Sequence, residues 1–287
     1  MPRGSTTWEE TILTPEEWHA WFSVQAGWTR PTRTWLYQQA GLARAGAVCA
    51  LGGAFAPGGV LEVGCGTGVI AGELARLSEA RVVGLDVAGG MLAFARRQEG
   101  GVTYVQADAH ALPFTAGSFD AVVCHYLLMW LADPAQAVRE MARVVRPGGA
   151  FAPGGAVLAC AEPDYGGRVD HPPELAPLGR LQAEALRQQG ADPEIGRQLG
   201  EFFVAAGLQA TVGVMAGRWD IPASPGGGCA PGGGFEAEWA MRERDLAGLI
   251  PPEELRRLRS VDRQALATGQ RVLFVPTFYA LGRKVNR

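Results

Sequence analysis

Short apolar runs and segments with helical spacing alternate along the first half of this chain. VLEV at 60–63 and ARVVGLD at 80–86 are rich in apolar and β-branched residues, as is typical of strands covered on both faces. VIAGELARL at 69–77 instead has the spacing of a helix. With two further strand-like runs at 102–108 and 121–125, the pattern predicts alternating strands and helices.

A glycine-rich turn follows the first strand. Gly64, Gly66 and Gly68 remove every second side chain, so the backbone can turn sharply and a ligand can approach its N–H groups. The turn opens onto a helix N-terminus, which carries free N–H groups and a partial positive charge. The pattern predicts a nucleotide-type site. It does not by itself select the cofactor, because Gly66, Gly68 and Ala71 also fit a weak dinucleotide fingerprint.

Two carboxylates end the next two strands. Asp86 follows Gly68 by 18 residues, where an acid can accept hydrogen bonds from two ribose hydroxyls. The alternative is that Asp86 only caps the helix that follows it. Asp108 ends the third strand in the same way.

These residues together resemble the class I S-adenosylmethionine-dependent methyltransferases. Glu62-x-Gly64-x-Gly66-x-Gly68 is similar to motif I of that family, whose loop packs against the methionine part of the cofactor. The acid ahead of the glycines argues against a dinucleotide, because a carboxylate would repel a pyrophosphate. The resemblance extends over about residues 60–165 through Leu112-Pro113-Phe114, Ser118-Phe119-Asp120 and Ala142–Gly149.

The resemblance implies that S-adenosylmethionine is the cofactor; no metal is expected. Asp86 would bond the ribose and Asp108 the adenine amino group. The residues expected to contact the cofactor are Glu62, Gly64, Cys65, Gly66, Gly68, Asp86, Val87, Met91, Asp108, Ala109 and His125.

The implied fold is α/β, a doubly wound, mostly parallel sheet of seven strands. Its last strand, expected within 271–284, is antiparallel, and Pro276 there favours an edge or irregular position. Residues 1–45 are expected to form an N-terminal helical cap. Residues 46–287 are expected to form the cofactor-binding domain, with a helical insertion at about 166–206 and 236–268.

Aromatic residues are dense near the N-terminus. Thr14-Pro15-Glu16-Glu17 is typical of a helix start. The two helices expected here either pack on the body of the protein or close over the cofactor and line an apolar acceptor pocket. The aromatic residues are Trp8, Trp18, Trp21, Phe22, Trp28, Trp35 and Tyr37.

Methyl transfer is an in-line displacement in which orientation supplies much of the rate, so a base is needed only if the acceptor must lose a proton. The candidate bases are five residues at the ends of the fourth and fifth strands: His125, Tyr126, Asp164, Tyr165 and His171. Each also has a structural interpretation. His125 could be a neutral, hydrogen-bonded histidine, and Tyr165 and His171 could anchor a loop.

Composition excludes several classes of function. The 287 residues carry a net charge of −3, which gives no strong attraction to nucleic acid. No apolar run is long enough to span a membrane, and residues 1–5 lack the pattern of a secretory signal. The five cysteines contain no C-x-x-C pair, which argues against a disulfide framework or zinc site and fits a reducing cytoplasm.

A repeated sequence, GGAFAPGG, occurs at 52–59 and 148–155, with a near copy at 227–234. Glycine and proline at this density cannot continue a helix or a central strand, so the copies are interpreted as loop insertions.

The function expected is methyl transfer from S-adenosylmethionine to a small-molecule acceptor. A nicotinamide-dependent oxidoreductase and a cofactor-binding regulatory protein without transfer activity are the alternatives. Nucleic-acid and membrane partners are not expected. Amino-directed nucleic-acid methyltransferases carry an Asn/Asp-Pro-Pro-aromatic motif after strand four, where this chain has Cys124-His125-Tyr126-Leu127. The acceptor atom and the oligomeric state are left open.

Overall fold

The computed structural model of the chain describes residues 13–42, 59–78, 80–98, 100–147, 155–216 and 235–284. Apart from Gly59 and Gly155, the three glycine- and proline-rich repeats lie outside these residues, as do Trp8, Cys49 and Cys229. The helices are α1 (Pro15–Ala40), α2 (Val69–Leu77), α3 (Gly89–Ala95), α4 (Pro134–Val144), α5 (Pro177–Gln188), α6 (Leu199–Ala205), α7 (Phe235–Leu246) and α8 (Pro252–Ala267). The strands are β1 (Val60–Val63), β2 (Val82–Asp86), β3 (Val102–Gln106), β4 (Ala121–His125), β5 (Ala156–Pro163), β6 (Val169–His171), β7 (Gln209–Val214), β8 (Val272–Phe274) and β9 (Thr277–Arg283).

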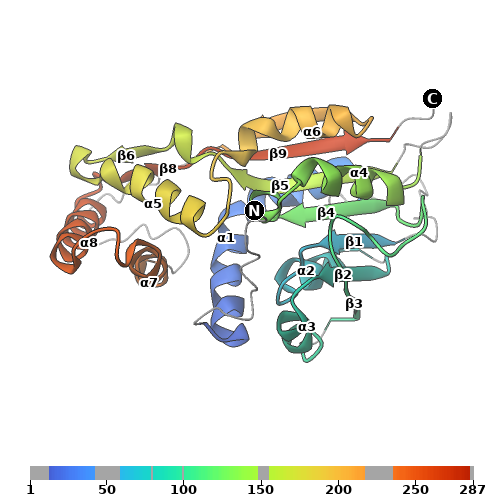
Figure 1. Cartoon of the computed structure of the whole chain (residues 1–287), viewed down its shortest axis with the longest axis horizontal. Coiled ribbons are helices and arrows are strands. Elements are labelled where there is room, and N and C mark those ends of the chain that lie inside the picture. The colour runs from blue at the N-terminus through green and yellow to red at the C-terminus, as the bar shows by residue number, and fades with distance from the viewer. Residues whose placement is uncertain are drawn as a thin grey trace, which may run out of the picture.

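Seven strands form one mixed sheet in the order β3-β2-β1-β4-β5-β9-β7 (Figure 1). The pairs from β3 across to β5 are parallel, and β9 runs antiparallel to both β5 and β7. This confirms the expected doubly wound α/β fold with an antiparallel last strand. Because β1 lies between β2 and β4, the carboxyl ends of these three strands meet at one edge, where ligands of such sheets bind.

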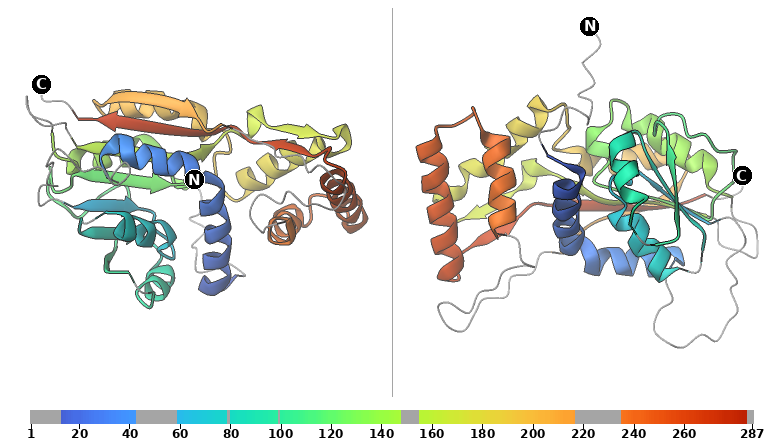
Figure 2. Two further views of the ribbon diagram at one scale, coloured as in Figure 1. Left: turned by 180° about the vertical axis from the view of Figure 1, so that it is seen from behind. Right: turned by 90° about the horizontal axis from the view of Figure 1, so that it is seen from below.

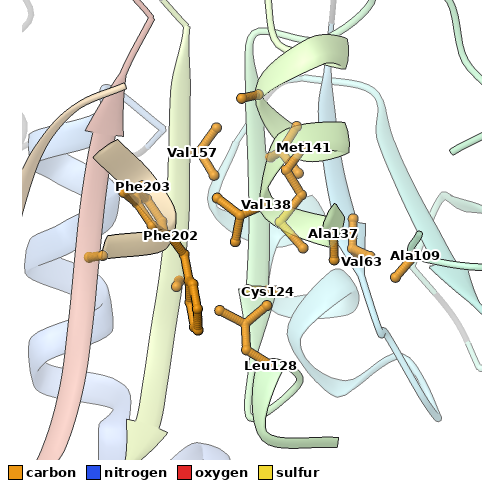
Figure 3. Close-up of a cluster of buried hydrophobic side chains, with 14 of the residues drawn as sticks. Val63, Ala109, Cys124, Leu128, Ala137, Val138, Met141, Val157, Phe202 and Phe203 are labelled. Atoms are coloured by element: carbon orange, nitrogen blue, oxygen red, sulfur yellow. The ribbon is translucent and has the colours of Figure 1, made fainter. Parts of the chain in front are cut away.

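Helices cover both faces of the sheet. The helices α4 and α6 lie on one face, where Val138 and Met141 of α4 meet Val157 of β5 and Phe202 and Phe203 of α6 (Figure 3). The helices α1, α2 and α3 cover the other face. A sheet buried on both sides needs strands that are apolar throughout, and all four residues of β1 are buried.

The described part of the N-terminal segment, residues 13–42, forms one helix where two were expected. Thr14 caps α1, its Oγ1 accepting from the backbone N of Glu17 while Glu17 bonds back to the backbone N of Thr14. Pro31 lies inside the helix, where it has no N–H to donate, and the helix bends along its length (Figure 2). The bend lets the second half pack on α2 and β5 while the first half reaches α3.

A second lobe extends from the ends of β5 and β9 (Figure 1). It contains the two-stranded sheet β6-β8 and the helices α5, α7 and α8. Its apolar core includes Leu178, Trp239 and Leu258. The helix α6, which lies within the expected insertion, packs on the large sheet instead, because Phe202 and Phe203 belong to the sheet's core.

The last predicted strand is divided between the two sheets. Pro276 separates β8, which pairs with β6 in the lobe, from β9, which is an interior strand between β5 and β7. Proline has no N–H for a strand ladder, so the break falls at this residue, although β9 itself is not an edge strand. The Pro276 carbonyl still accepts a hydrogen bond from the backbone N of Asp164 at 2.8 Å.

Lys284, the single lysine of the chain, holds the end of α4 against the sheet. Its Nζ donates to the carbonyl oxygens of Ala142 (2.7 Å), Arg143 (3.2 Å) and Val145 (2.9 Å). These carbonyls belong to a helix C-terminus, which has no intrahelical donors for them and carries a partial negative charge.

We therefore expect Lys284→Met to lower the free energy of unfolding by roughly 1–2 kcal/mol, measured by urea denaturation. Lys284→Arg, which keeps the charge and the N–H donors, should lose less. Equal stability of the methionine variant and the wild type would contradict this role for Lys284.

Candidate active site at the carboxyl ends of the parallel strands

The glycine loop between β1 and α2 requires residues without side chains. Gly64, Gly66 and Gly68 have φ values of 74°, 49° and 83°, in the left-handed region that favours glycine. A Cβ on Gly64 would lie 2.6 Å from Cδ1 of Leu127, and one on Gly68 would strike the Tyr104 hydroxyl. The loop is therefore fitted closely between its neighbours and leaves no room for larger residues.

Asp86 ties this loop to the end of β2. Its Oδ2 accepts from the backbone N of Gly66 at 2.7 Å, and its Oδ1 accepts from the backbone N of Ala88 at 2.9 Å. Burial raises the pKa of Asp86, while these N–H groups oppose the shift. A carboxylate has about four acceptor positions, so roughly two are left for the hydroxyls of a ligand.

Glu62 is a second buried carboxylate beside the loop. It lies on β1 opposite Gly84 of β2 and is 2% exposed. It accepts a backbone hydrogen bond from Ala71, in the first turn of α2, but its Oε2 has no partner among the described residues. Burial, with the nearby Asp86 carboxylate, raises the pKa of Glu62 well above its usual range. Two close carboxylates favour a positively charged ligand.

The other residues expected to contact the cofactor lie around the glycine loop, Glu62 and Asp86. Val87 is 58% exposed beside Asp86, and Met91 packs with Trp18 of α1. Asp108 accepts from the backbone N of His110 at 2.8 Å and from its Nδ1 at 2.7 Å, and these bonds lower the pKa of Asp108. Cys65 belongs to the loop and has a buried side chain. Ala109 is buried in the apolar core between the sheet and α4.

The helix α1 lies across the glycine loop. Nδ1 of His19 is 3.0 Å from Oγ1 of Thr67, and the ring of Phe22 lies 3.0 Å from where a Cβ of Gly66 would be. Arg33, which is fully buried, donates to both carboxylate oxygens of Glu73 on α2, at 2.8 and 2.6 Å. These contacts fix the aromatic face of α1 over the strand ends.

His125, the last residue of β4, is half-buried under α1. Its Nε2 lies 2.9 Å from Oγ1 of Thr29. Burial, with the nearby Arg33 guanidinium, lowers the pKa of His125 to about 3. The imidazole is therefore neutral at physiological pH and a weak base.

Glu162, at the end of β5, organises the turn that follows β4. Its carboxylate accepts from the backbone N–H groups of 127–129 at 3.0, 3.0 and 3.3 Å. A bulge in β5 at Ala161, whose φ is 64°, interrupts its pairing with β9 just before Glu162. Tyr126, between β4 and this turn, is also held at a positive φ of 52°. Such strained residues persist only where surrounding bonds hold them.

The other candidate bases are placed differently. Tyr165 is partly buried after β5, with the Arg168 guanidinium 5.9 Å from its ring centroid, and burial raises its pKa. The Asp164 carboxylate accepts hydrogen bonds from Nη2 and Nε of Arg197, at 2.6 and 2.8 Å. His171 ends β6 in the lobe, is exposed, and is not brought together with the glycine loop and Asp86.

Sequence reasoning missed Thr29, Arg33 and Glu162 as members of this centre. Thr29 and Arg33 are polar residues on a helix far away along the chain, and no local pattern links them to β4. Glu162 could have been singled out as an acid at the end of a buried strand, the same signal that identified Asp86.

Comparisons with known proteins agree with this geometry. The family described as "Methyltransferase domain" matches residues 61–152. Malonyl-[acyl-carrier protein] O-methyltransferase of Enterobacter lignolyticus is 41% identical over 93 residues, 32% of this chain and 37% of that protein. Demethylmenaquinone methyltransferase of Thermus thermophilus is 43% identical over 99 residues, 33% of this chain and 45% of that protein. The chain thus spans less than half the length of these curated relatives.

A solved structure shares the fold. It is named as a methyltransferase from an antibiotic biosynthesis pathway of Anabaena variabilis and gives a TM-score of 0.55 at 15% identity, over 79% of this chain and 92% of that one.

The strand order and the glycine loop define a Rossmann-like, cofactor-binding α/β domain. Residues 61–152 carry a methyltransferase domain of the class I S-adenosylmethionine-dependent type. The cofactor used by domains of this class is S-adenosylmethionine. No helix in the described part of the chain is long and apolar enough to cross a membrane.

Glu162 generates a pH-dependent prediction. Burial raises its pKa from 4.5 to about 7, so its contribution to stability is complete below about pH 4.5 and is lost as the pH rises through about 7. We expect the stability advantage of the wild type over Glu162→Gln to fall by roughly 2–3 kcal/mol between pH 5 and pH 8 in urea denaturation. Glu254→Gln, at a partly exposed glutamate of α8 paired with Arg257, is the control and should show no such fall. A stability difference between the wild type and Glu162→Gln that is the same at pH 5 and pH 8 would contradict the raised pKa of Glu162.

Proposed function

We propose that the whole protein is an S-adenosylmethionine-dependent methyltransferase that acts on an apolar or planar small-molecule acceptor. The observation that carries the proposal is the Asp86 carboxylate, which is bonded to the amide of Gly66 in the glycine loop and keeps acceptor positions for a ribose diol. The matched domain of residues 61–152 supports the reaction class.

The residues present fit the cofactor. Glu62 and Asp86 lie close enough for the charge of Asp86 to raise the pKa of Glu62, and a cationic ligand would relieve that repulsion. We propose that Asp86 binds the ribose, Val87, Met91 and Asp108 surround the adenine, and the glycine loop receives the methionine part. S-adenosylmethionine supplies a methyl group already activated by its positively charged sulfur.

The chain's own residues would then bind and orient the acceptor. The rings of Trp21 and Trp28 on α1 pack edge to face, with their centroids 5.4 Å apart. The guanidinium carbon of Arg244 on α7 lies 5.0 Å from the ring centroid of Trp18. We propose that the acceptor enters between this aromatic face and the ends of β4 and β5, beside Tyr126. Orientation in such a site can supply roughly 7–11 kcal/mol of the barrier, so little acid–base help is needed.

We also propose that the protein works in the cytoplasm. The described cysteines Cys65, Cys124 and Cys160 are all free and buried, which suits a reducing compartment.

The first test is calorimetric titration with S-adenosylmethionine and S-adenosylhomocysteine. Asp86→Asn, which removes a charged hydrogen-bond acceptor, should weaken binding by about 10- to 100-fold. Glu201→Gln, at an exposed glutamate of α6 on the opposite face of the sheet, should bind as the wild type does. Failure of the wild type to bind either compound would overturn the proposal, and full affinity in Asp86→Asn would remove Asp86 from the site.

Glu62→Gln should separate binding from stability. It replaces a buried carboxyl group, whose raised pKa favours the uncharged form in the ligand-free protein, with a neutral amide that keeps an oxygen for Ala71, so the ligand-free protein should unfold at an equal or higher urea concentration. Cofactor affinity should nevertheless fall, because the positive ligand loses a carboxylate. Loss of stability without loss of affinity would indicate a purely structural role for Glu62.

A further inference from the structure

His125 occupies a central place in the site. On one side, His125 is paired with Cys160 of β5. On the other side, the preceding residue Cys124 is paired with Val63, the last residue of β1, so His125 lies beside the start of the glycine loop. Its side chain lies on the face of the sheet covered by α1, where Nε2 is 2.9 Å from Oγ1 of Thr29. Nδ1 makes no hydrogen bond with the described residues, and the ring is only half-buried.

Hydrogen bonds around Thr29 decide which atom carries each proton. The Arg33 guanidinium can only donate, and its Nη1 donates both to Oγ1 of Thr29 and to the carbonyl of Ala26, the latter at 2.9 Å. The Thr29 hydroxyl must direct its own proton elsewhere. The Ala26 carbonyl is 3.5 Å away, at the limit of a hydrogen bond, whereas Nε2 of His125 is at 2.9 Å. Thr29 therefore donates to Nε2.

Donor and acceptor cannot exchange roles in this series of hydrogen bonds. Arg33 is charged at every relevant pH, fully buried, and held by both oxygens of Glu73. Glu73 thus orients Arg33, and Arg33 orients the Thr29 hydroxyl. That hydroxyl donates its proton to the lone pair of Nε2. A neutral imidazole with Nε2 as acceptor carries its proton on Nδ1.

We propose that His125 serves the reaction as a fixed neutral hydrogen-bond donor, its Nδ1–H directed at an oxygen atom of a bound molecule, and not as a base. The inference deepens the proposed methyltransferase function and rests on it for the identity of that molecule. The oxygen belongs either to the cofactor's carboxylate or to the acceptor. In either case the acceptor's nucleophile does not need His125 to remove its proton.

The surroundings of His125 keep it neutral. The ionisable groups on the elements packed against it include Arg33 of α1, Glu62 of β1, Cys160 of β5 and the adjacent Tyr126, and among them Arg33 is the charge that acts on the imidazole. Burial raises the pKa values of Glu62, Cys160 and Tyr126, so these groups favour their uncharged forms. Arg33 is a fixed positive charge and disfavours a second one on the imidazole.

The tautomer can be measured without any acceptor, by two-bond proton–nitrogen correlation NMR of the ¹⁵N-histidine-labelled protein. His125→Gln identifies the His125 signals. The expected result is a protonated Nδ1 and an unprotonated Nε2, unchanged from pH 8 to pH 5.5. A protonated Nε2, or an imidazolium appearing within this range, would overturn the proposal.

Two variants test whether Thr29 fixes the tautomer. Thr29→Ser keeps the hydroxyl and should keep the wild-type spectrum, whereas Thr29→Val keeps the shape, removes the hydroxyl and should introduce the Nε2–H form. An unchanged tautomer in Thr29→Val would contradict the role assigned to Thr29.

Titration with S-adenosylhomocysteine then separates the two sources of the oxygen. A downfield shift of the Nδ1 proton assigns it to the cofactor's carboxylate, and an unmoved signal in the bound protein assigns it to the acceptor. Absence of binding would count against the proposed function, while the tautomer of the ligand-free protein would still decide the inference about His125.

Discussion

The candidate site depends on the attachment of the glycine loop to the end of the neighbouring strand. The amides of Gly64 and Cys65 both donate to the carbonyl of Leu85, at 2.7 and 3.0 Å, and the amide of Gly66 donates to the Asp86 carboxylate. The end of β2 thus sets the path of the loop that leaves β1. One parallel pairing, with β1 and β2 in register, fixes the loop, the start of α2 and the acid that faces them.

Two buried glutamates show how similar residues acquire different roles. Glu162 accepts from three backbone N–H groups and holds the turn after β4, where Tyr126 is strained. Glu62 has one backbone donor and an oxygen without a partner. The charged form of a buried carboxyl group with incomplete partners is unfavourable, which is tolerable where a ligand later supplies the compensating positive charge. The contrast separates a residue that supports the site from one suited to contact the cofactor.

The helix α1 connects the cofactor end of the sheet to the second lobe. Its second half is locked to α2 through Arg33 and Glu73, and its first half lies against α3 and, through Trp18, against Arg244 of α7. The bend at Pro31 allows both contacts within one element. The same helix supplies Thr29, so the protonation of His125 is coupled to how α1 packs.

Local sequence determined the strands, the glycine loop, the capped start of α1 and the acid that ends β2, because periodicity, glycine spacing and capping act over a few residues. Asp108, expected as the last residue of the third strand, instead follows β3, which ends at Gln106. Local sequence also identified His125 as a site candidate, but not its protonation. Tertiary structure decided that Pro276 divides the last strand between two sheets, that His171 lies in the lobe, and that Thr29, Arg33 and Glu162 surround the end of β4. These outcomes depend on contacts between residues far apart along the chain, 96 positions for Thr29 and His125 and 127 positions for the paired Ala156 and Arg283, and no short-range pattern encodes such contacts.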